Sequence, residues 1–507
     1  MPLSRLAANK RPHKRIARDF GGVPRGVNVK TTGLLFASAV SVGLTLGFAA
    51  FAQETTVQTK QYDTGGIYEG EFQNGKQHGQ GTYRLPNGYE YSGNWIEGRI
   101  EGQGSAKFPN GSVYQGAFIN GKPEGKGKII FADGGTYEGD WLDGKITGKG
   151  IAIYANGVRY EGEFKDAKHH GTGTMTSPNG FIYVGTWVGG EQDGTGKITY
   201  PDGAIYDGAL VAGKREGLGK LTLADGLTYV GEWKGGQING TGVLVQANGD
   251  QYEGQLVEGK KQGKGTATFA NGDVYDGDFA AYQRHGNGSF TGADGYAYVG
   301  DWVQGRIEGT GKVTYPDGSI YEGSLLNDIA NGSGKITYKD GSSYEGGWVN
   351  GVIEGAGIAR YQNGLVYEGE FKNAKNHGKG KMTYQDGYQY SGDWKDGLRD
   401  GQGVATYADG TIYTGGFVAG QREGSGTITM ADGFEYTGGW KAGEIDGEGV
   451  AKYANGDTYE GFFRNGQRQG RGIMKYASGQ EYDGFWADGQ QASEDEAAAA
   501  DKADNAN

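Results

Sequence analysis

The chain of 507 residues has no cysteine and only 9 prolines. Without cysteine it can form neither a disulfide framework nor a zinc site built on thiolates. The shortage of proline excludes a collagen helix, although glycine supplies 103 residues, because collagen combines its regular glycine with abundant proline. A disordered glycine-rich chain is poor in aromatic residues, whereas this one has 34 Tyr, 19 Phe and 9 Trp. Glycine together with aromatic residues predicts short strands joined by many tight turns.

Acidic residues outnumber basic ones beyond the first 52 residues. The net charge of the whole chain is −12. Residues 1–52 hold eight Lys and Arg against Asp19 alone, a net +7, so the remainder carries −19. An acidic body repels phosphate backbones, which excludes nucleic acid as a partner. It also disfavours tight docking on an anionic membrane surface.

The N-terminal segment has the pattern of an export signal. Basic residues precede an apolar run from Gly33 to Ala52, which ends in Ala50-Phe51-Ala52. A basic region, an apolar region and an A-x-A end are typical of a secretory signal peptide. The alternative is an uncleaved anchor, because about twenty residues are enough to cross a bilayer. With either interpretation of residues 1–52, we expect the rest of the chain in the periplasm of a Gram-negative bacterium, free or held at the inner membrane by a single span.

A Tyr-x-Gly motif recurs every 23 residues. It begins at Tyr68 and continues without insertion or deletion to Tyr482, which makes nineteen units. With this tyrosine as position zero, position +2 is glycine in every unit, position +4 is aromatic or leucine, and positions +11, +13 and +20 are glycine in all eighteen complete spacings. Self-similarity at a fixed short period predicts a repeat array. Residues 68–489 therefore form the array, preceded by a polar leading segment at 53–67 and followed by a polar tail rich in Ala, Asp and Glu at 490–507.

Two turn motifs divide each unit. Positions +19 and +20 read Asn-Gly or Asp-Gly almost everywhere, as at Asn87-Gly88, and positions +6 and +7 often do the same, as at Asn74-Gly75. These dipeptides favour hairpin turns in which both central residues take a positive φ. Two turns in each unit imply two strands in each unit, so the chain is predicted to be a run of antiparallel β-hairpins.

The period of two along a strand assigns the faces of each hairpin. Positions 0, +2 and +4 share one side of the first strand, and we expect positions +11, +13, +15 and +17 of the second strand on that same side. The predicted structural aromatic face includes Tyr68, Phe72, Tyr91, Trp95, Tyr137, Trp141, Tyr160, Phe164, Trp187, Trp233, Trp302, Trp348, Trp394, Trp440 and Trp486. Positions +1 and +3 form the opposite face, the candidate partner face, with the carboxylates Glu69, Glu71, Glu138, Asp140, Glu161 and Glu163.

Two segments carry a family resemblance. Residues 68–81 read YEGEFQNGKQHGQG and residues 160–173 read YEGEFKDAKHHGTG, with Ala167 in place of one glycine. The pattern Y-x-G-x-[FW]-x-x-G-x-x-x-G-x-G resembles the MORN repeat (membrane occupation and recognition nexus). The resemblance implies an all-β fold, an elongated single-layered antiparallel sheet of tandem β-hairpins. It also implies scaffolding or membrane-linked roles, and a homodimer.

The tryptophans indicate an older duplication. Tryptophan at position +4 occurs in every second unit, and its alternation slips once, at Phe279. Copying a block of nine units must break an alternating pattern once, because nine is odd. We therefore interpret residues 68–274 as a block duplicated at 275–481 and followed by a terminal unit. The alternative is a functional hinge at 275–302.

The titratable residues show no catalytic pattern. Four histidines occupy position +10, in units too far apart to share one metal ion, and they are His78, His170, His285 and His377. Carboxylate pairs recur in unit after unit, whereas a catalytic pair is singular and set in a cleft. We therefore expect a solvated face and no cofactor, no metal site, no catalytic residue and no enzymatic activity.

Two classes of function fit these observations. The first is a structural or interaction scaffold of the cell envelope that binds protein or cell-wall partners along the sheet. The second is a phospholipid-binding module at a membrane. The charge of −19 beyond residue 52 favours the scaffold.

Export can be tested with reporter fusions. An alkaline phosphatase fused after Lys60 should be active, because that enzyme gains activity only outside the cytoplasm and residues 1–52 carry the signal pattern. A β-galactosidase fused at the same point should be inactive. The reverse pattern of activities would contradict export.

Overall fold

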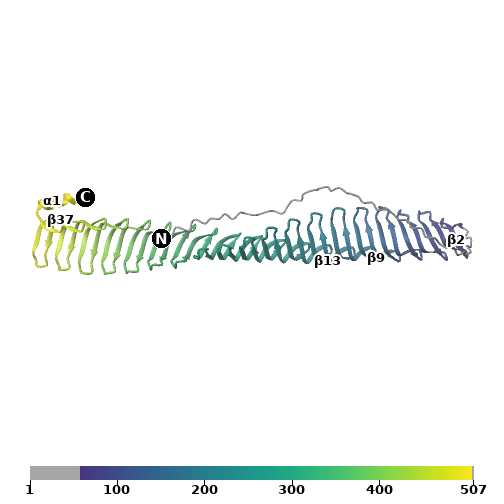
Figure 1. The fold of residues 1–507 in the computed structure, drawn as a ribbon, viewed down its shortest axis with the longest axis horizontal. Coiled ribbons are helices and arrows are strands. Elements are labelled where there is room, and N and C mark those ends of the chain that lie inside the picture. The colour runs from purple at the N-terminus through teal and green to yellow at the C-terminus, as the bar shows by residue number, and fades with distance from the viewer. Residues whose placement is uncertain (1–56, 505–507) are drawn as a thin grey trace, which may run out of the picture. The chain divides into compact units, whose positions relative to one another are not determined.

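The structure, a computed structural model, describes residues 57–504. These divide into two compact units, the N-terminal region at 57–247 and the C-terminal region at 248–504. The signal predicted at 1–52 lies outside the described residues. Both units consist almost wholly of strands (Figure 1), and within each unit consecutive strands pair antiparallel in one layer. The prediction of an all-β sheet of tandem hairpins is confirmed.

Two strands form each hairpin, a shorter one of seven residues and a longer one of nine. The strands of the first unit are β1 (Gln58–Gln61), β2 (Ile67–Gln73), β3 (Lys76–Arg84), β4 (Glu90–Ile96), β5 (Arg99–Lys107), β6 (Val113–Ile119), β7 (Lys122–Ile130), β8 (Thr136–Leu142), β9 (Lys145–Ile153), β10 (Arg159–Lys165), β11 (Lys168–Thr176), β12 (Ile182–Val188), β13 (Glu191–Thr199), β14 (Ile205–Val211), β15 (Lys214–Thr222), β16 (Thr228–Lys234) and β17 (Gln237–Val245). Those of the second are β18 (Gln251–Val257), β19 (Lys260–Thr268), β20 (Val274–Ala280), β21 (Gln283–Thr291), β22 (Ala297–Val303), β23 (Arg306–Thr314), β24 (Ile320–Leu326), β25 (Ile329–Thr337), β26 (Ser343–Val349), β27 (Val352–Arg360), β28 (Val366–Lys372), β29 (Lys375–Thr383), β30 (Gln389–Lys395), β31 (Leu398–Thr406), β32 (Ile412–Val418), β33 (Gln421–Thr429), β34 (Glu435–Lys441), β35 (Glu444–Lys452), β36 (Thr458–Arg464), β37 (Gln467–Lys475), β38 (Glu481–Ala487) and β39 (Gln490–Ala492), followed by helix α1 (Glu494–Asp504).

The two turns of a unit differ in conformation. Asn74 and Gly75 have φ values of 52° and 78°, as predicted for the turn at positions +6 and +7. At positions +19 and +20 the prediction was wrong for the first residue. Gly88 has φ 90° while Asn87 stays outside the left-handed region, and the Asn87 side chain instead accepts a hydrogen bond of 3.0 Å from the Tyr89 N–H. This longer loop is closed by an ordinary turn followed by a left-handed glycine, and so it needs only one residue with positive φ.

A bulge interrupts the pairing inside each hairpin. In the unit of Tyr160, Gly162 pairs with Gly173, but the next residue, Glu163, pairs with His170. Two residues of the longer strand, Gly171 at position +11 and Thr172, therefore have no partner in β10, although both pair with β12. Gly171 has φ 60°, and a Cβ there would collide with the Glu163 carboxylate. The assignment of position +11 to the aromatic face was wrong, because the bulge turns this position toward the side of position +3.

The repeated tyrosine closes this bulge. In every one of the nineteen units its hydroxyl donates a hydrogen bond to the backbone carbonyl of position +3. The Tyr160 ring lies flat over Gly162 and Gly173, and a Cβ at Gly173 would collide with the ring. The glycines at positions +2 and +13 are therefore required by the tyrosine that covers them, and Tyr160 is fully buried as a result.

The aromatic rings link each unit to the next. The Tyr160 ring meets Phe164 of its own unit edge-to-face at 5.0 Å and Trp187 of the following unit at 5.3 Å. Eight of the nine tryptophans donate an indole hydrogen bond to the position +13 carbonyl of the preceding unit. Trp187 does not, and the edge of its ring meets His169 instead. The residues predicted for the aromatic face are all buried except Phe72, which lies in the first hairpin and is half-buried.

The segment proposed as a hinge is built of ordinary hairpins. Strands β20, β21 and β22 pair in the same register as other units, with Gly277 opposite Gly288 and Gly288 opposite Gly300. The irregularity is confined to the turn, where Tyr282 takes φ 73°. A side chain in this conformation costs about 1–2 kcal/mol, so the strain is local to that turn.

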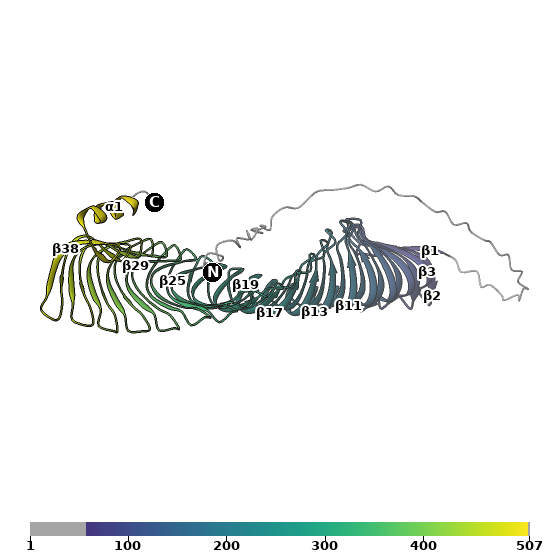
Figure 2. The same cartoon turned by 60° about the vertical axis from the view of Figure 1, so that its left-hand side comes forward.

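A short strand and a helix cap the last hairpin. Strand β39 pairs with β38, and α1 contacts β37 and β38 (Figure 2). Ser493 begins the helix, since its hydroxyl accepts a hydrogen bond from the Glu496 N–H while the Glu496 carboxylate accepts one from the Ser493 N–H. This reciprocal capping stabilises a helix start. Within the described residues, the tail predicted as polar is therefore largely helical.

Replacing Trp187 with Ala should destabilise the array locally. The ring is buried between Tyr160 and Tyr183, and truncation of a core aromatic residue costs about 3–5 kcal/mol. Hydrogen exchange should accelerate in residues 160–210 and stay unchanged in residues 57–120, since each unit packs only on its neighbours. An even loss of protection over all hairpins would contradict nearest-neighbour packing.

Candidate interaction groove

A groove of about 1230 Å³ crosses several repeats of the N-terminal region on the face opposite the tyrosines, from β5 to β13. Its floor is bare backbone, because the facing glycines at positions +2 and +13 direct their missing side chains toward the tyrosines. The floor consists of Gly116, Gly127, Gly139, Gly150, Gly162, Gly173 and Gly185. The same requirement that buries the tyrosines thus leaves a channel on the opposite face.

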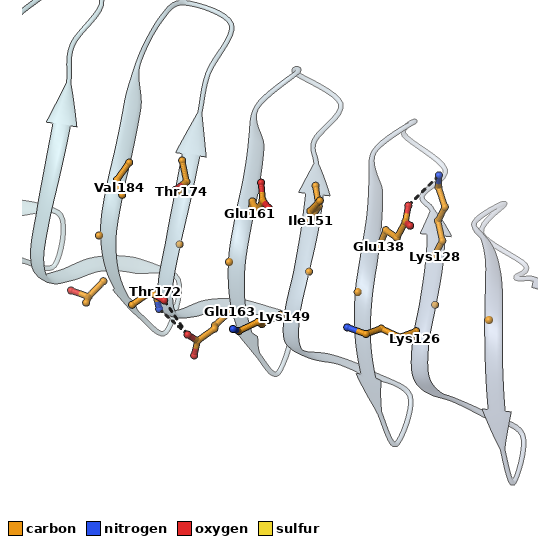
Figure 3. Close-up of a pocket in the computed structure, with 18 of the residues that line it drawn as sticks. Lys126, Lys128, Glu138, Lys149, Ile151, Glu161, Glu163, Thr172, Thr174 and Val184 are labelled. Carbon is orange, nitrogen blue, oxygen red and sulfur yellow. Dashed lines mark hydrogen bonds and ion pairs between the residues drawn. The ribbon is translucent and has the colours of Figure 1, made fainter. Parts of the chain in front are cut away.

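Two rows of side chains form the walls (Figure 3). Positions +1 and +14 lie beside each other across neighbouring strands, as Glu161 does with Ile151 and Thr174. This first wall is Gln115, Lys128, Glu138, Ile151, Glu161, Thr174 and Val184. Positions +3 and +12 form the second wall, with Gln103, Lys126, Lys149, Glu163, Thr172, Thr186 and Thr195.

The charges of the walls balance. Three lysines and three glutamates line the groove. Lys128 lies 3.5 Å from Glu138, and Lys126 lies 2.6 Å from Asp140 just outside the groove. The hydrogen bond from Lys126 lowers the pKa of the Asp140 carboxyl, so this residue stays charged at neutral pH. A groove without net charge and with many hydroxyl, amide and paired charged groups suits a polar, neutral or mixed-charge partner better than a polyanion.

The six predicted carboxylates divide into two kinds. Those at position +1 are more than half exposed, with side-chain exposures of 55% for Glu69, 68% for Glu138 and 57% for Glu161. Two of those at position +3, Asp140 and Glu163, serve the bulge of their own hairpin. Asp140 accepts a hydrogen bond of 2.9 Å from the Lys149 N–H, and Glu163 accepts one of 3.0 Å from the Thr172 hydroxyl. Glu138, Glu161 and Glu163 line the groove, whereas Glu69 and Glu71 lie on the first hairpin, away from it.

The residue at position +10 has a structural role that the sequence did not reveal. In many units its side chain accepts a hydrogen bond from the backbone N–H of the next unit's first turn, as Glu101 does from Asn120 at 3.1 Å and His377 from Asp396 at 3.5 Å. His377 therefore holds neighbouring turns together. No group of three or more His, Asp or Glu residues between 57 and 504 is placed to hold a metal ion.

Position +9 was also missed. In the second strand its side chain faces the tyrosines, and at His169 the ring stacks on Tyr160 at a centroid distance of 3.8 Å. Burial lowers the pKa of His169 to about 4, so the imidazole is neutral at pH 7. The signal available in the sequence was a basic residue two places before the position +11 glycine. It recurs at Arg215, Lys261, Arg284, Arg399, Arg422 and Arg468.

The MORN repeat family model matches eighteen segments between residues 68 and 481, and so the chain belongs to the MORN repeat family. No curated protein matches the sequence. In the described part of the chain, no helix is long and apolar enough to span a membrane.

The solved structures that resemble the chain do so only weakly. One is the SAS-4 (dCPAP) TCP domain of Drosophila melanogaster in complex with a proline-rich motif of Ana2, with 18% identity over 31% of this chain and 85% of that chain and a TM-score of 0.21. Another is the TCP10 domain of Danio rerio CPAP with a peptide of STIL, with 14% identity over 54% of this chain and 100% of that chain and a TM-score of 0.17. Such scores carry no inference about function.

The two kinds of carboxylate should respond differently to truncation. Glu163→Ala should lower the free energy of unfolding of its region by about 1 kcal/mol, because the Thr172 hydroxyl and N–H at the bulge lose their acceptor. Glu161→Ala should change it by less than about 0.5 kcal/mol, because the carboxylate is exposed. Local hydrogen exchange of β10 and β11 in the two variants measures both effects. Equal destabilisation would mean that position +1 is structural as well.

Proposed function

We propose that this MORN repeat protein is a non-catalytic scaffold of the cell envelope that binds a protein or cell-wall partner along the groove of the N-terminal region. The observation that carries the proposal is the groove itself, a glycine-floored channel with two polar walls crossing strands β5 to β13. Repeat arrays commonly use such extended surfaces for binding.

The groove favours a partner with both hydrogen-bonding groups and charges of both signs. Lys128 and Glu138 place charges of both signs side by side on the first wall. An extended polypeptide or a cell-wall fragment, which presents amide, hydroxyl and charged groups in a row, matches such walls. The balanced charge offers no special attraction to an anionic phospholipid surface, so the membrane module is the second candidate. The envelope location rests on the signal pattern at residues 1–52.

A bulky substitution in the groove tests this function. Thr174→Trp should block the channel and abolish recovery of the partner that the wild-type protein captures from crosslinked cells, because Thr174 lies in the first wall. Thr176→Trp is the matched control. It lies on the same strand, two residues away and therefore on the same face, but outside the groove, and it should retain the partner.

The same variants separate the two candidates. The mature protein, residues 53–507, should not float with vesicles of anionic phospholipid. Flotation that Thr174→Trp abolishes and Thr176→Trp preserves would replace the scaffold with the lipid-binding module. Capture of the same partner by both variants would show that the groove is not the binding surface.

A further inference from the structure

Several units fill the space between their aromatic rings with an arginine of their own. Arg215, at position +9, places its guanidinium carbon 4.1 Å from the Trp233 ring centroid and 5.8 Å from that of Tyr206. The same guanidinium donates a hydrogen bond of 2.9 Å to the carbonyl of Gly236. The cage therefore consists of the tyrosine of one unit and, from the next unit, the position +4 aromatic ring and the position +7 carbonyl.

The arrangement recurs in the C-terminal region. Arg284, Arg422 and Arg468 lie 4.2, 4.3 and 4.1 Å from the tryptophan rings of their following units. Arg284 and Arg468 also donate to the position +7 carbonyl, at 3.3 and 2.6 Å. A guanidinium held over an indole face gains cation–π energy, and Arg suits such sites because it is planar and weakly hydrated. Several cages of the array therefore already hold a guanidinium group.

The cage of Tyr114 and Trp141 is one of those without an arginine. Position +9 of the unit of Tyr114 is Pro123, whose side chain cannot reach across the rings. A cavity of about 600 Å³ opens there, and its lining includes Tyr114, Trp141 and Gly144. These are the equivalents of Tyr206, Trp233 and Gly236, which hold Arg215 in its own cage.

The indole of the open cage is less covered than those beneath an arginine. Trp141 is 7% exposed, whereas Trp233 is 3% and Trp486 is 2% exposed. Two further rings, Phe108 and Phe131, line the cavity and extend its aromatic wall.

Polar groups lie at the mouth of the open cage. Asp166 and Lys145 line it and pair with each other at 3.1 Å, so together they add no net charge. Asn110 and Ser112 also line it, and the Asn110 side-chain oxygen already accepts the Ser112 N–H at 3.0 Å. The rim thus carries no net charge that would repel a cation.

We propose that this open cage binds an arginine side chain supplied by a partner protein. The guanidinium enters over the Trp141 ring and donates to the Gly144 carbonyl, as the internal arginines do in their cages. The site lies on the tyrosine face, opposite the polar groove, so it is a second interaction site and stands or falls independently of the proposed function. Lys261 lies 4.7 Å from the Tyr252 ring in another cage, so a lysine is accepted as well, but without the planar fork of arginine.

Indole resonances of the ¹⁵N-labelled mature protein test the proposal directly. The probe is the capped tripeptide Gly-Arg-Gly, compared at constant ionic strength with Gly-citrulline-Gly, which has the same shape without the charge. The Arg peptide should shift the Trp141 indole signal, assigned with Trp141→Phe, and the citrulline peptide should bind about tenfold more weakly. Equal binding of the two peptides, or no shift at Trp141, would overturn the proposal.

Two substitutions at position +9 provide the controls. Pro123→Arg should fill the cage from within and abolish the Trp141 shift, while the other eight indole signals stay in place and report an intact fold. Pro123→Ala should leave the cage open and preserve binding. Retained binding by Pro123→Arg, or loss with Pro123→Ala, would contradict the proposal.

A gain of function completes the test. Arg215→Ala empties a filled cage, and the Arg peptide should then shift the Trp233 indole signal as well. Because Trp141 lies several hairpins away, its own response should be unchanged. A folded Arg215→Ala protein whose Trp233 signal ignores the peptide would show that these cages hold only internal arginines.

Discussion

One hydrogen bond sets the shape of every hairpin, from the tyrosine hydroxyl to the carbonyl of the bulge three residues later. To make it, the ring must lie flat along its own strand, which leaves no room for a Cβ at positions +2 and +13. The flattened ring in turn exposes its edge and face to the aromatic residues of two units. The bulge, the glycine pattern and the contacts between units all follow from this geometry.

The same constraint produces the two surfaces. Glycines that accommodate a tyrosine on one side leave unoccupied backbone on the other, and the neighbouring positions rise around it as the walls of a groove. Glycine interrupts the packing of most sheets. Here it is compensated, because each missing side chain is replaced on the buried face by a tyrosine ring.

Variation between units is concentrated where the frame tolerates it. Position +9 holds arginine, lysine, histidine, glutamine, asparagine, isoleucine, alanine or proline, because it points into a space between rings that can be filled or left open. His169 fills it as a neutral ring stacked on Tyr160, whereas Arg215 fills it as a cation. Pro123 leaves it open. The contents of this space can therefore differ from one unit to the next without a change in the backbone.

The sequence alone was sufficient to determine the 23-residue unit, its two strands, the buried tyrosine face and the MORN family, because the spacing of glycine and aromatic residues directly records the alternation of side chains along a strand. It could not show the bulge, since Gly171 and Gly173 are both glycines two residues apart and only the pairing of Glu163 with His170 places the first on the other side. It also missed the role of position +9, because the space that this side chain enters is formed by the rings of two units, as Tyr160 and Trp187 do around His169. The separate roles of Glu161 and Glu163, and the open cage beside Pro123, were decided by contacts across the bulge and between neighbouring units, which the pattern along a single strand does not contain.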